Sequence, residues 1–119
     1  AEEKYQEVEK RPEVAVGGFD KVQIQVGEVI KCEPVPKAKK LLVSQIKIGA
    51  ETRQIVSGIA KYYKPEEMVG KKVAVITNLK PCKLCGVESQ GMILAAGDDE
   101  GNLSVVTVDK DIVSGSEIC

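Results

Sequence analysis

Residues 73–96 read VAVITNLKPCKLCGVESQGMILAA, a cationic and polar segment enclosed by two apolar runs. The runs at residues 73–77 and 92–96 have the length and aliphatic character of buried strands. The enclosed segment, residues 78–92, is expected to be a loop, and a loop held by rigid strands is where binding residues tend to lie. Its lysines stand beside amide and hydroxyl side chains, which suits contacts to phosphates and bases better than catalysis.

Strand-like patterns continue on both sides of this stretch. The pattern predicts strands at residues 22–26 (continuing to 32), 42–48, 53–57 and 103–108. Residues 64–70 predict one short helix, since Pro65 suits a first turn and Gly70 a stop. One short helix between the third and fourth strands is the order of an OB-fold. We therefore predict an all-β chain folded as a five-stranded, partly open Greek-key barrel.

Composition indicates one domain with an aliphatic core. Hydrophobic residues make up 43% of the 119 residues and aromatic residues only 3%. No apolar run approaches the roughly 20 residues of a membrane helix, and the polar N-terminus has no signal-peptide core. Residues 1–17 are charged and weakly apolar and predict a linker or flexible tail, with the compact domain at 18–119. A first residue other than Met favours a fragment of a larger protein.

Positive charge is concentrated in the middle of the chain. Residues 31–88 carry twelve basic and five acidic side chains, whereas residues 89–119 carry one basic and six acidic. This asymmetry is typical of a surface that binds an anion, although a solvated lysine face gives the same count. Lys37, Lys39 and Lys40 are expected in a basic loop after the first strand, which Pro34 and Pro36 end. If the barrel closes as predicted, that loop and the one with Lys80 and Lys83 flank the same face.

The end of the enclosed segment offers more specific chemistry. Ser89 and Gln90 carry donors and acceptors that could read base edges or ribose hydroxyls. Met92 could lie under a base, but its pattern favours the core. Neither basic loop contains an aromatic residue, which disfavours a protein that coats single strands and favours a shaped RNA such as tRNA.

Four cysteines and no histidine limit the catalytic and metal chemistry of the chain. Cys82 and Cys85 form one C-x-x-C, whereas a structural zinc site needs four ligands; Cys32 and Cys119 could complete a set, but their spacing does not recommend it. Reduced thiols in the cytosol are the default, and a metal-dependent protein is a minor alternative. Without histidine the usual general base near neutral pH is missing, so we expect no enzyme and no cofactor.

Several segments resemble the tRNA-binding domain found at the C-terminus of bacterial methionyl-tRNA synthetases. The same domain occurs in free-standing dimeric tRNA-binding proteins and in endothelial monocyte-activating polypeptide II. The resemblance covers about residues 18–119 and rests on residues 19–21, 26–29, 35–42, 54–59, 63–67, 78–81 and 86–92. Cys82 and Cys85 depart from the pattern, because many members carry basic residues there. Lys39 departs as well, since that position is often acidic.

The resemblance implies a non-catalytic, cytoplasmic domain that binds structured tRNA with little sequence preference. It further implies a homodimer joined through strands that extend the barrel at the C-terminus, with no membrane and no small-molecule substrate. Together with the two basic loops, it predicts the following RNA-binding residues: Lys37, Lys39, Lys40, Asn78, Lys80, Lys83, Ser89, Gln90 and Met92. The alternative is an OB-like module that assembles with other proteins.

Overall fold

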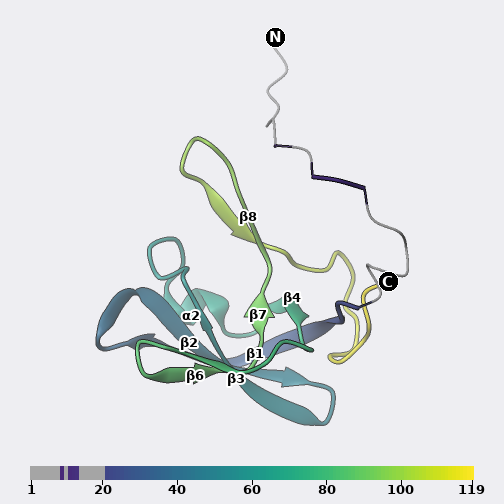
Figure 1. Cartoon of the computed structure of the whole chain (residues 1–119). Helices are drawn as coiled ribbons and strands as arrows, with labels where there is room; N and C mark the ends of the chain where they lie inside the picture. The colour runs from purple at the N-terminus through teal and green to yellow at the C-terminus, as the bar shows by residue number, and fades with distance from the viewer. Residues whose placement is uncertain (1–8, 10, 14–20) are drawn as a thin grey trace.

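The computed structural model describes residues 9, 11–13 and 21–119, and its backbone is mostly β (Figure 1). One sheet has the strand order β3-β2-β1-β4-β7, and two small ribbons pair β5 with β6 and β8 with β9. The sheet strands are β1 (Ile24–Val35), β2 (Ala38–Ile48), β3 (Glu51–Ser57), β4 (Lys72–Ile76) and β7 (Met92–Ile93). The ribbons are β5 (Cys82–Leu84), β6 (Val87–Ser89), β8 (Ala95–Gly97) and β9 (Leu103–Val105), and the one helix is α2 (Pro65–Met68). The predictions of a mainly β chain and of a short helix between the third and fourth strands are confirmed.

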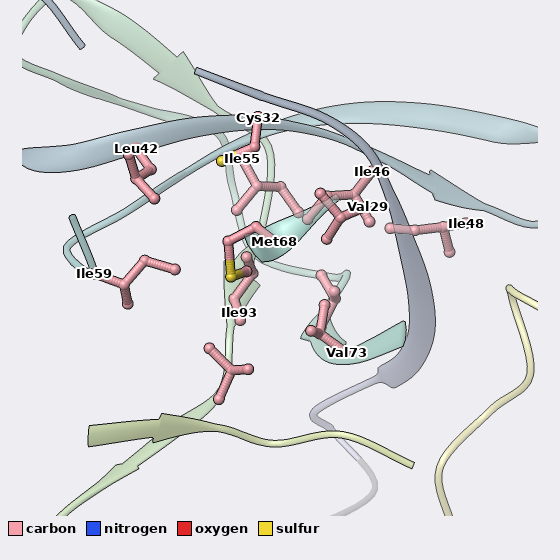
Figure 2. Close-up of a cluster of buried hydrophobic side chains, with 12 residues drawn as sticks. Val29, Cys32, Leu42, Ile46, Ile48, Ile55, Ile59, Met68, Val73 and Ile93 are labelled. Atoms are coloured by element: carbon pink, nitrogen blue, oxygen red, sulfur yellow. The ribbon is translucent and has the colours of Figure 1, made fainter. Parts of the chain in front are cut away.

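An aliphatic core lies inside the curved sheet (Figure 2). Ile46 and Ile55 come from β2 and β3, Val73 from β4, and Met68 from the helix, and none of the four exposes any of its surface. α2 therefore covers the core through a single side chain, while its first turn carries Glu66 and Glu67. Negatively charged side chains in the first turn stabilise a helix, because its N-terminus carries partial positive charge.

β1 and β2 form a longer hairpin than the sequence predicted. The proline pair does not open a loop: β1 runs through Pro34 to Val35, and β2 starts at Ala38. The expected basic loop at residues 37–40 was therefore wrong, because Lys39 and Lys40 belong to β2 and only Lys37 lies in the turn. Pro34 is tolerated because β1 has no partner on its other side there, since β4 pairs only with Ile24–Glu28.

Gly27 lets β1 pack closely against β2. The register of β1 against β2 shifts between Val29 and Lys31 and again between Pro34 and Val35, whereas Gly27 pairs in regular register with Val73 of β4. A Cβ on Gly27 would lie 2.5 Å from Cγ2 of Ile46, so glycine is required for close packing against β2.

The expected strand at residues 92–96 is divided between two sheets. β7 pairs with β4, and β8 starts at Ala95 and pairs with β9 away from the main sheet. The strand expected at 103–108 ends at Val105, and the first strand begins at Ile24 instead of residue 22. In Figure 1 the β8–β9 ribbon projects from the body of the domain.

The C-terminal segment returns to the sheet. The amide of Ile118 donates to the carbonyl of Ile24 (2.8 Å) and that of Val26 to the carbonyl of Ser116 (2.9 Å). Lys72 anchors the approach to this segment with a 2.6 Å ion pair to Asp111, which holds the pKa of that carboxyl below its ordinary value. Residues 115–118 therefore run along β1 without forming a strand, joined to it by hydrogen bonds and by the single bridge between Gln25 and Glu117.

The main sheet is open by its strand pairing. Within the described part of the chain, no ladder joins the end strands β3 and β7. The prediction of a linker at residues 1–17 lies mostly outside the described residues, as does the start of the predicted domain at residues 18–20. None of the described residues forms a helix long and apolar enough to cross a membrane.

Candidate nucleic-acid interface

The cationic segment expected to be a loop contains a β-hairpin. β5 and β6 pair with Cys82 opposite Ser89 and Leu84 opposite Val87, which leaves Cys85 and Gly86 as a two-residue turn. Both turn residues have positive φ, 50° and 80°. Positive φ at both central residues is the type I′ geometry, whose twist matches that of paired strands. The hairpin thus gives the segment a defined shape.

Hydrogen bonds fix the hairpin to the outer edge of β3. The Ser89 hydroxyl accepts from the Val56 amide (3.0 Å) and donates to the Gly91 carbonyl (3.1 Å). The amide of Gln90 donates to the carbonyl of Gln54 (2.8 Å), and the amide of Gln54 donates to the side-chain oxygen of Gln90 (3.0 Å). Ser89 is only 2% exposed, so its hydroxyl faces the protein and not solvent.

Arg53 of β3 supports the same segment through hydrogen bonds to its backbone. Its guanidinium donates to the carbonyls of Thr77 and Gln90, on either side of the hairpin, and pairs with Glu51 at 2.8 Å. The planar guanidinium carries five donors in a fixed arrangement and can satisfy several acceptors at once. The position of this side chain could not be predicted from the sequence, because only the packing of β3 against the hairpin brings the two carbonyls to it.

Asn78 anchors the start of the segment. Its side-chain oxygen accepts from the Gln23 amide (2.8 Å) and its side-chain nitrogen donates to the Lys21 carbonyl (2.6 Å). Asn78, Ser89 and Gln90 therefore have the same structural role, since each holds backbone through its side chain.

Lys80, Lys83 and Met92 form the solvent-facing part of the segment. Both lysines are exposed, and within the described residues neither forms an ion pair. Glu88 stands opposite Lys83 in the hairpin and reduces the local positive charge. Met92 is 50% exposed, so the pattern that favoured a core position was wrong. Leu79 and Leu84, 41% and 39% exposed, add apolar surface beside the lysines.

β3 brings the lysines of the β1–β2 hairpin and those of the β5–β6 hairpin to the same end of the sheet. Because Leu42 pairs with Ser57 and Ile48 with Glu51, the start of β2 lies beside the end of β3. Ser89 bonds Val56 and Gln90 bonds Gln54, so β6 runs antiparallel to β3 and its turn points toward that same end. The tips of the β1–β2 and β5–β6 hairpins lie on the same side of the molecule in Figure 1. Lys37, Lys39 and Lys40 on the first hairpin are all exposed or partly exposed.

The two cysteines of the C-x-x-C are badly placed to act together. Cys82 lies in an extended strand and Cys85 follows in its turn, which separates their Cα atoms by about 10 Å. A disulfide needs Cα atoms within about 7 Å.

The described residues contain no group of three or more side chains suited to hold a metal. Cys32 is buried beside Ser44, and burial raises the pKa of its thiol.

Comparison with known proteins identifies the family. The model of the tRNA binding domain family matches residues 24–117. The chain is a member of this family. It is 59% identical over 110 residues to a methionine–tRNA ligase of Methanocaldococcus jannaschii, and 53% identical over 117 residues to that of Bacillus subtilis. These alignments cover 92% and 98% of the chain but only 17% and 18% of the ligases, so the chain spans less than a fifth of these relatives.

Solved structures agree with this assignment. A methionyl-tRNA-synthetase-related protein from Pyrococcus horikoshii superposes with a TM-score of 0.86 at 38% identity, covering 92% of this chain and all of that one. The chaperone CsaA of Bacillus anthracis shares the fold, with a TM-score of 0.82 at 20% identity over 91% of this chain and 100% of its own. The chain is thus a non-catalytic tRNA-binding domain, homologous to part of the methionyl-tRNA synthetases.

Proposed function

We propose that this domain binds structured tRNA through the two hairpin tips at the end of β3. The observation that carries the proposal is their convergence: five solvent-accessible lysines, Lys37, Lys39, Lys40, Lys80 and Lys83, come from segments far apart in the sequence. Lysines on such a surface bind phosphates and carry no sequence information, which fits recognition of a tRNA by its shape.

We divide the predicted RNA-binding residues into two groups. The lysines and Met92 contact RNA, because they are exposed and project from braced strands. Asn78, Ser89 and Gln90 hold the hairpin in position, because their side chains already bond protein backbone. Loss of a positioning residue would lower the stability of the hairpin, and loss of a lysine would weaken RNA binding through charge.

We further propose an OB-fold barrel in which contacts between β3 and the hairpin close the open sheet. The hydrogen bonds between Gln54 of β3 and Gln90, just after β6, support this closure. In the intact protein the domain is proposed to be the C-terminal appendage of a cytoplasmic methionyl-tRNA synthetase. It is proposed to form a homodimer through its C-terminal segment, whose exposed apolar side chains include Val113 (76% exposed).

The central test is the paired variant Lys80→Ala with Lys83→Ala. Each lysine that contacts a phosphate displaces bound counterions, so removing two should weaken binding to all tRNAs alike. The slope of log affinity against log salt concentration should become less steep by about 1–2. Binding is measured by fluorescence anisotropy of labelled bulk tRNA across a salt series, with the same titration on duplex DNA.

Two variants control for net charge. Lys47→Ala with Lys110→Ala removes the same charge, from the other end of β2 and from the C-terminal segment, and should leave the slope unchanged. Glu88→Gln removes the carboxylate opposite Lys83 and should strengthen binding. Equal weakening by both lysine pairs would reduce the effect to overall charge and move the site away from the hairpin. Absence of tRNA binding by the folded wild type would favour the protein-assembly module.

A further inference from the structure

Two consecutive tyrosines in the connection between β3 and α2 have different surroundings. The hydroxyl of Tyr63 accepts from the Val105 amide (3.1 Å), and the Lys71 ammonium lies 5.8 Å from the centre of its ring, so Tyr63 is tied to the fold. Tyr62 leaves 40% of its surface exposed. The amides of both residues donate to the Ile59 carbonyl, at 2.9 Å for Tyr62 and 3.0 Å for Tyr63, which gives this exposed ring a fixed backbone.

Tyr62 lies at the cationic end of the sheet. The amide of Ala60 donates to the carbonyl of Lys40 (3.2 Å), which places this connection against the start of β2. Lys61 and Lys64 flank the ring in sequence and are exposed, and neither forms an ion pair within the described part of the chain. Of the nearby carboxylates, that of Glu67 accepts from the Lys64 amide (3.2 Å), while Glu66 is exposed to solvent.

We propose that Tyr62 stacks against an unpaired base of the bound tRNA, with Lys61 and Lys64 holding the adjoining phosphates. The proposal rests on the proposed function and extends its surface beyond the hairpin tips. An exposed aromatic ring between cations is the combination that single-stranded nucleic acid recognises, because every base has a face that can stack. A base pair inside a duplex has no free face, so this subsite selects a loop or a single-stranded end and does not contribute to binding of paired RNA.

A single substitution makes the contact visible. The chain contains no tryptophan, so Tyr62→Trp introduces the only indole. Its emission should be quenched when tRNA binds, through direct stacking, and should not change with a blunt, fully paired RNA duplex. Affinities for the same two RNAs are then compared among wild type, Tyr62→Ala and the matched control Tyr62→Phe, which keeps the ring and loses only the hydroxyl.

The expected result is a loss of about tenfold in tRNA affinity for Tyr62→Ala, wild-type affinity for Tyr62→Phe, and no change toward the duplex. Wild-type tRNA affinity of Tyr62→Ala would overturn the proposal, and so would equal losses toward tRNA and duplex. If the Lys80–Lys83 variant still weakens binding in those cases, the proposed function stands without this subsite. Failure of the wild type to bind tRNA at all would overturn both.

Discussion

At the scale of single residues, a substitution of Ser89 tests whether this side chain holds the hairpin in position or contacts RNA. Ser89→Ala leaves the Val56 amide without its acceptor in a buried place, so the free energy of unfolding should fall by about 1–3 kcal/mol. Urea denaturation followed by circular dichroism measures the change. Well below the unfolding transition, tRNA affinity should stay within about twofold of wild type. Unchanged stability combined with a large loss of affinity would instead make Ser89 an RNA contact.

Ser89 and Met92 show what residue type can and cannot predict. Both belong to a segment that its composition correctly marked as special, but their exposure is the opposite of what each suggested: the serine is 2% exposed and the methionine 50%. The reason is the pairing of β6 and β7 with different partners, since Ser89 bonds β3 whereas Met92 pairs with Ile76 of β4. Local sequence indicates chemistry, but only the partner strand decides which face is covered.

At the scale of elements, the β5–β6 hairpin carries a strained turn residue. Cys85 has φ of 50°, a left-handed conformation that cysteine adopts reluctantly and asparagine adopts readily. Because Cys85 is exposed, Cys85→Asn removes no packing and should raise the free energy of unfolding by a few tenths to about 1 kcal/mol. Urea denaturation under reducing conditions tests this, with Cys82→Asn, at a strand position, as the control expected to destabilise. A lower stability for Cys85→Asn would contradict the type I′ account.

Elements with long, regular patterns were predictable, whereas the turns of the β1–β2 and β5–β6 hairpins were not. β2, β3 and β4 follow their hydrophobic patterns closely, and Pro65 correctly marked the start of α2. The β1–β2 turn was missed because two prolines usually end a strand, yet Pro36 lies in the turn itself and Pro34 in a part of β1 that β4 does not pair with. The β5–β6 turn was missed because a Cys-Gly pair lacks the usual Asn-Gly or Asp-Gly signal.

At the scale of the whole molecule, the lysine-bearing hairpin tips and the apolar C-terminal segment lie on different parts of the fold. Lys37, Lys39, Lys40, Lys80 and Lys83 gather at the end of β3, while the C-terminal segment exposes Val106 (41%), Ile112 (44%) and Ile118 (36%) in addition to Val113. The sequence predicted a basic middle and an acidic end, but their separation in space depends on the return of residues 115–118 along β1. A second copy could therefore pack on the C-terminal segment without covering the lysines.

This separation leads to a prediction about assembly. Val113→Asp places a charge in the most exposed apolar position of the C-terminal segment, and burying an unpaired charge between subunits is costly. If the proposed homodimer uses this surface, its dissociation constant should rise by at least about tenfold. The molecular mass measured by light scattering over a concentration series should then shift toward the 12.8 kDa monomer, with an unchanged circular dichroism spectrum.

Val69→Asp, at a side chain 48% exposed after α2, is the matched control and should remain dimeric. A dimer that survives Val113→Asp at low concentration would place the interface elsewhere, and a monomeric wild type would remove the dimer from the proposed function while leaving the lysine surface open to the same tRNA tests.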